Sequence, residues 1–402
     1  MLLRKQSIVC KDRTTIYVMP ATSRRRVALL VETSLGSGRE ILRGIGRYAR
    51  QASNWQLFHA AGGLAEAMPD WMMNWKGDAV IARIQNPETL AQLSGLNIPV
   101  IDVLGVCENQ FPLVHVDDEA IGRLVGGYFL GRDFQHFGFY GIAGENWSDR
   151  RCEAFREHCR HGNSFHELNL PRLLKGGAPE RFLQVQEWVR QLPKPTAIMV
   201  CSDQRGLELL EACLSENIAV PEEIAVVGVD NDAALCEISD PPLSSVRGGH
   251  FNVGLEAARA VDLILSSGAL PSKLVRVPPN GIVERESSAV KAISDAVVAQ
   301  GVSYIRQNLA ASVTNDSIAR VCGVSRTLFQ KRFRESMGQS IREFILEKRL
   351  ERALLLIRSS DITLADAAER SGFKHQEYLG QIVKRRTGQT PGQIRKEHLN
   401  RP

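Results

Sequence analysis

Residues 224–231 read Ile224-Ala-Val-Val-Gly-Val-Asp-Asn231, a run of six apolar residues that ends in two polar ones. An apolar run of this length predicts a strand that is buried on both faces, as in a parallel sheet. The stretch Ala197-Ile-Met-Val-Cys201 has the same character, and the segment Gln204–Asn217 between the two runs is helix-like. Strand, helix and strand in this order favour an α/β fold with parallel strands.

The same alternation extends toward the amino terminus. Further strand-like runs lie at 27–32, 55–60, 78–83, 98–104, 113–116 and 137–142. Between the first two of these runs, the segment Gly38–Arg50 carries apolar residues at helical spacing. About 260 residues of this pattern are enough for two lobes, so we expect residues 27–287 to form a doubly wound, two-lobed α/β domain.

The last quarter of the chain has a different composition. Strand-like runs stop after Ser288, and the remaining sequence is almost wholly helical in pattern. Residues 290–402 contain 20 lysines and arginines against 11 aspartates and glutamates, a net charge of +9, whereas the other 289 residues carry −4. A basic segment attached to a mildly acidic body indicates a polyanionic partner. We therefore expect a domain boundary near residue 289, in addition to a basic amino-terminal tail at residues 1–26.

The helical segment contains an internal repeat. Ala319-Arg-Val-Cys-Gly323 and Ala368-Glu-Arg-Ser-Gly372 share the pattern AxxxG, and a second glycine, Gly338 or Gly388, follows each of them after 15 or 16 residues. A small alanine lets two helices approach, and a glycine permits the positive φ of the turn between them. The repeat predicts an all-α domain with two helix-turn-helix units, joined by an amphipathic helix at 340–357.

The second helix of each unit carries a polar outer face. In the first unit, Ser325 is positioned to cap the helix, and Phe329 and Phe333 lie four residues apart on its inner side. The candidate DNA contacts are Arg326, Thr327, Gln330, Lys331 and Arg334 in the first unit, and His375, Gln376, Glu377, Gln381 and Lys384 in the second. Arginine, lysine and glutamine suit base edges in the major groove and phosphates. The alternative interpretation is a merely solvated basic face.

These motifs resemble the DNA-binding domain of AraC-type regulators over nearly all of residues 295–398. The matching positions are Ala319, Gly323, Ser325, Phe329, Lys331, Phe333, Gly338, Ile345, Arg349, Ala353 and Leu355 in the first unit, and Gly372, Phe373, Leu379, Lys384, Gly388, Thr390, Pro391 and Arg395 in the second. Leu379 and Val383 stand where the family usually has aromatic residues. We therefore expect the second unit to have a smaller core.

The larger region, 27–287, resembles the effector domain of LacI-type repressors and the periplasmic ribose-binding proteins. The resemblance is carried by Pro195–Asp203, Ile218–Pro221, Ile224–Asn231, Pro241–Val246, Gly254 and Val277–Ser287. No LacI-type helix-turn-helix precedes this region. A LacI-like sensor followed by an AraC-like domain is the arrangement of bacterial xylose-operon regulators, which the chain most resembles.

The resemblance implies a ligand cleft between the lobes, at the carboxyl ends of the strands. By resemblance the best sugar contacts are Asp117, Arg151, Asp203 and Asp230, and the same strand ends also carry Glu32 and Asn231. Carboxylates accept sugar hydroxyls, a guanidinium donates to adjacent hydroxyls in a fixed fork, and Trp147 offers an apolar face to a sugar ring. For each residue the alternative is a structural cap or a surface acid.

Several classes of protein are excluded or disfavoured. The sequence has no P-loop, HExxH or GxSxG motif, so we expect neither an enzyme nor a bound cofactor. None of the eight cysteines forms a CxxC pair or has zinc-ligand spacing. No apolar run is long enough to span a membrane, and the basic start lacks the features of a secretory signal. These observations favour a cytoplasmic protein with reduced thiols.

The sequence therefore predicts a sugar-responsive transcription regulator, an activator of pentose (xylose) catabolic genes. Its expected partners are promoter DNA, a pentose effector, a second copy in a homodimer and, for an activator, RNA polymerase. Three alternatives stay open. The chain is a repressor, it senses a different small molecule, or it is an enzyme or sugar carrier whose basic tail aids solubility.

Overall fold

The computed structural model describes residues 24–52, 54–60, 68–107, 111–269, 272–359 and 362–399. Residues 1–23 of the expected basic tail lie outside this part of the chain. The last two tail residues, Arg25 and Arg26, instead begin the first strand. They were assigned to the tail because of their charge, but Arg25 pairs with Asp262 and Arg26 contacts the rings of Phe58 and Trp75.

The amino-terminal lobe is built on a six-stranded parallel sheet with the order β11-β5-β4-β3-β1-β2. Its strands are β1 (Arg25–Leu30), β2 (Trp55–His59), β3 (Ala79–Ala82), β4 (Val100–Asp102), β5 (Leu113–Val116) and β11 (Leu274–Val277). Its helices are α1 (Gly36–Ala52), α2 (Asp70–Met73), α3 (Pro87–Ser94) and α9 (His250–Ser267). Alternate strand residues pack against α1 and α9 on one face and against α2 and α3 on the other.

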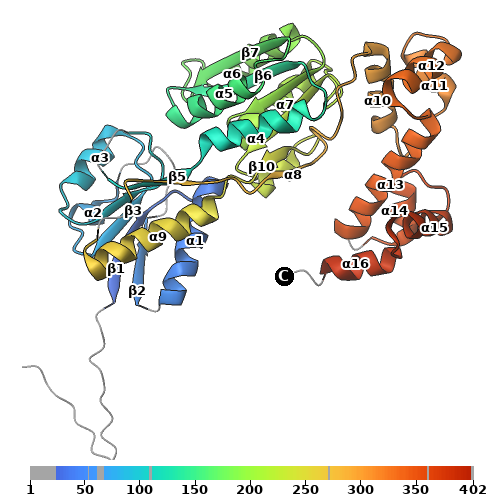
Figure 1. The fold of residues 1–402 in the computed structure, drawn as a ribbon. Coiled ribbons are helices and arrows are strands. Elements are labelled where there is room, and N and C mark those ends of the chain that lie inside the picture. The colour runs from blue at the N-terminus through green and yellow to red at the C-terminus, as the bar shows by residue number, and fades with distance from the viewer. Residues whose placement is uncertain are drawn as a thin grey trace, which may run out of the picture.

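The carboxy-terminal lobe has a second six-stranded sheet with the order β12-β10-β9-β8-β6-β7, in which only β12 is antiparallel. Its strands are β6 (His136–Ala143), β7 (Ser164–Pro171), β8 (Thr196–Val200), β9 (Ile224–Val229), β10 (Ser244–Val246) and β12 (Ile282–Val283). Its helices are α4 (Asp118–Leu130), α5 (Asn146–His158), α6 (Gly177–Gln191), α7 (Asp203–Ser215) and α8 (Ala233–Ile238). The two lobes confirm the predicted α/β sensor fold (Figure 1).

The chain crosses between the lobes three times. It passes from β5 to α4, from β10 to α9 and from β11 to β12. The first crossing ends where Asp117 caps α4, and the second ends at His250, the first residue of α9. Parallel strands end at the same edge of a sheet, so the carboxyl ends of both sheets and these crossings meet between the lobes.

The helical domain consists of two packed units (Figure 1). Its helices are α10 (Ala296–Gln307), α11 (Asn315–Val321), α12 (Arg326–Met337), α13 (Ile341–Ser359), α14 (Leu364–Arg370), α15 (Gln376–Thr387) and α16 (Pro391–Leu399). Helix α13 contributes Phe344 to the first core and Ile357 to the second. Gly323 and Gly372 have φ of +65° and +80°, which confirms the predicted turns.

The second unit keeps a complete core despite its aliphatic substitutions. Leu379 and Val383 are fully buried beside Phe373 and Ile382. In the first unit, Phe329 and Phe333 are fully buried on the inner face of α12, as their four-residue spacing predicts. Among the residues that the structure describes, no helix is both long and apolar enough to cross a bilayer.

Candidate ligand cavity and nucleic-acid interface

A cavity of about 200 Å³ lies between the two lobes. The amino-terminal lobe and the second crossing contribute Leu35, Ser37, Arg83, Gln85, Leu104, Val106, His115 and His250. The carboxy-terminal lobe contributes Ile142, Glu145, Trp147, Arg151, Arg172, Arg181, Ser202, Gln204, Arg205, Glu208 and Asp230. The structure therefore places Trp147, Arg151 and Asp230 in one cavity, as the sequence predicted for these three residues.

Asp230 follows β9 and faces the cavity from the carboxy-terminal lobe. Its backbone has φ of +107°, a left-handed conformation that non-glycine residues rarely adopt and that is common at functional sites. Burial raises the pKa of its carboxyl to about 6, against the opposing effect of Arg151 and Arg83. His250 Nε2 lies 3.7 Å from its Oδ1, and burial lowers the pKa of that imidazole well below its usual value. Asp230 therefore faces a neutral histidine, and its oxygens remain available to a ligand.

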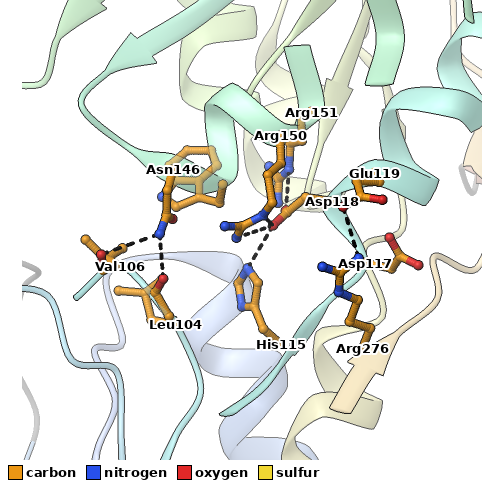
Figure 2. Close-up of polar contacts among 12 residues, drawn as sticks. Leu104, Val106, His115, Asp117, Asp118, Glu119, Asn146, Arg150, Arg151 and Arg276 are labelled. Carbon is orange, nitrogen blue, oxygen red and sulfur yellow. Dashed lines mark hydrogen bonds and ion pairs between the residues drawn. The ribbon is translucent and has the colours of Figure 1, made fainter. Parts of the chain in front are cut away.

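Arg151 is held in position by two groups (Figure 2). Its Nε donates to Asp118 Oδ1 at 2.9 Å, and one terminal nitrogen donates to the Cys201 carbonyl at 2.6 Å. The guanidinium lies 4.8 Å from the centre of the Trp147 ring. The Trp147 indole in turn donates to Glu145 at 2.8 Å. A fixed guanidinium beside an anchored indole suits a small ring that carries hydroxyl groups.

Asp118, which the sequence analysis did not select, does not line the cavity itself but holds the lining residue Arg151 in place (Figure 2). Its carboxylate accepts from Arg150 at 2.8 Å as well as from Arg151, and His115 Nε2 lies 3.5 Å away. Burial would raise the pKa of Asp118, but the adjacent Arg151, His115 and Arg150 hold it well below its usual range. The sequence analysis selected the neighbouring Asp117 instead. A fully buried acid beside a fully buried arginine is a tertiary feature that no local pattern encodes.

Four predicted contacts do not line the cavity. Asp117 caps α4 by accepting from the Ala120 amide at 2.9 Å. Asp203 is fully buried and accepts from Ser245 at 2.6 Å and from the Asp232 amide at 2.7 Å, and burial together with Asp230 raises its pKa to about 8. Asp117 is therefore a helix cap and Asp203 a buried structural acid, which is the alternative to a sugar contact that the sequence analysis left open.

The other two are Asn231 and Glu32, which also act on neighbouring protein groups. Asn231 accepts from Arg285 at 3.0 Å through its side chain. Glu32 is buried behind the cavity wall, where it pairs with Arg83. Both residues follow strands, which is why the sequence predicts them at the cavity, but their side chains contact Arg285 and Arg83 instead.

Arginines are prominent in the cavity, and each is paired with an acid. Arg83 pairs with Glu32, Arg151 with Asp118, Arg172 with Glu145, and both Arg181 and Arg205 with Glu208. Paired charges leave little net charge for an ionic ligand but many directed hydrogen-bond donors and acceptors. Among the described residues, no three histidine, cysteine, aspartate or glutamate side chains gather as a metal site requires. The lining therefore suits a small, neutral, polyhydroxylated molecule.

Direct contacts between the lobes flank the cavity. Arg39 on α1 pairs with Asp232 at 2.8 Å, and Asn146 at the start of α5 donates to the Gly105 carbonyl at 2.7 Å. Figure 2 shows the Asn146 contact beside the Asp118 cluster. Each of these contacts joins a residue of one lobe to a residue of the other. The structure thus represents an arrangement in which the lobes touch across the cleft.

The ten predicted DNA contacts are all exposed. Ser325 caps α12 by accepting from the Leu328 amide at 3.3 Å, as predicted. The candidates on α12 and α15 are exposed, whereas Phe333 and Val383 of the same helices are buried. Two further exposed cations, Arg385 and Arg386, extend the last turn of α15, where the sequence analysis selected only Lys384.

The two units are held together at one junction. Arg349 on α13 donates to the carbonyls of Leu309 and Ala311, both at 2.9 Å. Gly372, in the turn of the second unit, lies so close that a Cβ there would meet the Leu309 carbonyl oxygen at 2.0 Å. This packing fixes α12 relative to α15. One rigid domain therefore presents both helices to a duplex.

Lys331→Ala and Gln376→Ala are each expected to relax base preference at different positions of one binding site. Both side chains are exposed, on α12 and α15 respectively, and a lost base contact costs about 1–3 kcal/mol. Selection of each variant against a randomised DNA library measures the change. Equal weakening on all sequences would reduce both residues to phosphate contacts.

Comparison with known proteins assigns all three parts of the chain. Residues 26–117 match a XylR N-terminal domain, residues 127–288 a periplasmic binding protein-like domain, and residues 318–397 a helix-turn-helix domain. The Xylose operon regulatory protein of Escherichia coli (strain K12) is 28% identical over 391 residues, covering 93% of this chain and 97% of that protein. Its namesake in Haemophilus influenzae is 27% identical over 387 residues, covering 92% and 98%.

Solved structures agree with this assignment. The structure of the xylose-binding transcription activator XylR matches with a TM-score of 0.80 and 25% identity, covering 94% of this chain and 99% of that one. The complex of the transcriptional regulator CelR with cellobiose matches with a TM-score of 0.54 and 21% identity over 66% of this chain and 86% of that one, which supports the sensor fold alone. The chain is therefore a DNA-binding transcription regulator with a periplasmic binding protein-like sensor domain and a helix-turn-helix domain, and it resembles the xylose operon regulatory proteins along nearly its whole length.

Proposed function

We propose that this chain is a transcription activator that binds D-xylose between its sensor lobes and promoter DNA through its two helix-turn-helix units. The observation that carries the proposal is the cavity in which every arginine is paired with an acid while the Asp230 carboxylate faces the cavity beside His250. The similarity to xylose operon regulatory proteins over 93% of the chain supports the choice of sugar. The size supports a single sugar ring, because a cavity of about 150 Å³ accommodates benzene and this one measures about 200 Å³.

The lining residues have distinct tasks in this function. Asp230 accepts hydroxyl hydrogen bonds, Arg151 donates to adjacent oxygens, and the Trp147 ring covers the apolar side of the sugar. Because the lining comes from both lobes, a bound sugar stabilises the closed arrangement more than an open one. A ligand shifts a conformational equilibrium only through such a difference in affinity.

The same proposal covers the partners and the location. The chain acts in the cytoplasm as a homodimer, in which each protomer contributes two units to a promoter and RNA polymerase is recruited beside it. Sugar-driven closure changes how the two DNA-binding domains are presented. Analytical ultracentrifugation with and without D-xylose, followed by in vitro transcription from a bound promoter, tests this part separately from sugar binding.

Calorimetric titration with D-xylose, D-ribose and L-arabinose tests the central claim. We expect D-xylose to bind most tightly and to change the affinity of the full chain for a DNA fragment selected by that chain. A tighter response to another sugar would replace xylose as the effector. Repression of transcription in the presence of sugar would replace activation. DNA binding that ignores all three sugars would reject the proposed function.

Arg39→Ala is expected to weaken D-xylose binding by up to about fivefold, although Arg39 does not line the cavity. Its ion pair with Asp232 joins the lobes, and an exposed pair contributes about 0.2–1 kcal/mol. Losing the pair lowers the population of the closed state and thus the apparent affinity. The matched control is Arg43→Ala, which breaks an ion pair with Glu40 within the same helix. Calorimetry that finds equal affinities for both variants would contradict the prediction.

A further inference from the structure

The DNA-binding domain rests on one lobe of the sensor. Helix α10 is the part of this domain that faces the carboxy-terminal lobe (Figure 1). Its residues Val298, Val302 and Ile305 are buried in the core of the first helix-turn-helix unit. The other side of α10, with Gln300, Ser303 and Gln307 at helical spacing, lines a cleft of about 590 Å³ against the sensor. Helix α10 therefore belongs both to the core of the DNA-binding domain and to its contact with the sensor.

A buried ion pair bridges this cleft. Glu222, in the loop before β9, has a side chain only 2% exposed, and its Oε1 lies 3.5 Å from Arg306 Nε in the last turn of α10. Arg306 also lies 3.9 Å from Glu286, which is exposed. Burial raises the pKa of Glu222, while Arg306 and Lys348 oppose the shift. Glu222 Oε1 has no hydrogen-bond partner, so Arg306 is the group that compensates its burial. A buried charge without its partner is strongly unfavourable.

The covalent connection between the domains is short and anchored. Ser287 donates to the Val226 carbonyl at 2.7 Å, and the Ala292 amide donates to the Arg132 carbonyl at 2.9 Å. Asp295 then caps α10 and forms a bidentate pair with Arg332 of α12 at 2.6 and 2.7 Å. Only two residues separate Ala292, which is fastened to the sensor, from Asp295, which is fastened to the DNA-binding domain. A tether this short restricts the domain to orientations close to the lobe.

The contact lies at the opposite end of the sheet from the sugar cavity. Strand β9 begins two residues after Glu222 and ends immediately before Asp230. Strand β8 begins after Lys194 and Pro195, which line the interdomain cleft, and ends next to Ser202, which lines the cavity. Both strands are buried along their whole length. The lobe is therefore a rigid body with the sugar at one edge and the DNA-binding domain at the other.

We propose that Glu222 and Arg306 are positioning residues that seat the DNA-binding domain on the carboxy-terminal lobe, so that rotation of this lobe on sugar closure moves both recognition helices with it. This inference rests on the proposed function. The pair touches neither DNA nor sugar. Its role is to transmit the lobe movement, and loss of the pair lets the domain reorient independently about residues 293–294.

The test measures the ratio of DNA affinities of the full chain with and without saturating D-xylose, by fluorescence anisotropy on a fragment selected by the wild-type chain. Allosteric coupling typically changes affinity about 5–150-fold. We expect Glu222→Gln and Arg306→Gln each to reduce this ratio to about 1–2, with D-xylose affinity measured by calorimetry unchanged. Arg306→Lys, which keeps the charge, and the charge exchange Glu222→Arg with Arg306→Glu are expected to recover part of the ratio.

The matched control is Arg156→Gln, which breaks an ion pair with Glu167 in the same lobe, away from the cleft beside α10. The inference would be overturned if Glu222→Gln and Arg306→Gln both melt normally and both keep the wild-type ratio of DNA affinities with and without D-xylose. If Glu222→Gln fails to fold, Arg306→Gln decides alone, because the Arg306 side chain is 16% exposed and that of Glu222 only 2%. A wild-type chain that ignores D-xylose would instead reject the proposed function, so the two failures are distinguishable.

Discussion

Asp230→Asn is expected to weaken D-xylose binding by about one to two orders of magnitude, because a hydrogen bond to a charged group contributes about 1.5–3 kcal/mol and 1.4 kcal/mol is a factor of ten. The substitution keeps the shape of the side chain, removes the charge and replaces one acceptor oxygen by an amide donor. The folded protein should not lose stability. Burial already disfavours the carboxylate form and raises its pKa to about 6, so the neutral amide relieves a cost. Calorimetry and thermal melting of the variant measure the two effects.

The same pKa predicts the pH dependence of sugar binding. Lowering the pH through about 6 protonates Asp230 in the unliganded protein and removes the charged acceptor, so wild-type affinity should fall between pH 7 and pH 5. The Asp230→Asn variant should lack this dependence. The control is Asp117→Asn, because Asp117 caps α4 outside the cavity lining and asparagine caps a helix equally well. A loss of affinity as large in Asp117→Asn as in Asp230→Asn would contradict this assignment of the site.

DNA binding by the full chain should weaken by about three to five orders of magnitude when salt rises from 50 to 200 mM, as for proteins that neutralise six to ten phosphates. Exposed cations on the two recognition helices are the basis for this expectation: Arg326, Lys331, Arg334, Lys384, Arg385 and Arg386. Arg332 is excluded because it turns inward to Asp295. Fluorescence anisotropy across a salt series gives the slope.

Single variants then identify which cations meet phosphates. Arg334 and Lys384 occupy equivalent places in the two units, four residues before the glycine that ends each helix. Arg334→Gln and Lys384→Gln should each reduce the log–log slope by about 0.9. Arg259→Gln, on α9 of the sensor, should leave it unchanged. A slope near zero in the wild-type chain would mean that the basic face is merely solvated.

The local pattern of the sequence was sufficient for the architecture. Apolar runs such as 224–229 mark strands buried on both faces, and the AxxxG repeat marks two helix turns, because both signals depend on residues close together in the chain. The same holds for the recognition faces, where the spacing of Phe329 and Phe333 settles which side of α12 is exposed. Four strands were missed. β10, β11 and β12 have three, four and two residues, too few for a periodic signal, and β7 is an edge strand whose side chains are mostly half-buried on both faces.

The order of residues along the chain places polar side chains after the strands, which is enough to predict a polar cleft between two lobes. Which of these side chains face the cleft depends on how the whole chain packs. Asp203 and Asp230 both follow the ends of strands. Asp203 accepts hydrogen bonds from Ser245 and from the Asp232 amide, whereas Asp230 lines the cavity. Asp118 and Arg83 acquire their roles from partners far along the chain, as do Glu208, through Tyr140 and Arg181, and the Glu222–Arg306 pair. The free energy of a buried charge depends on its partners across the fold, and these are set by packing and not by neighbouring residues in the sequence.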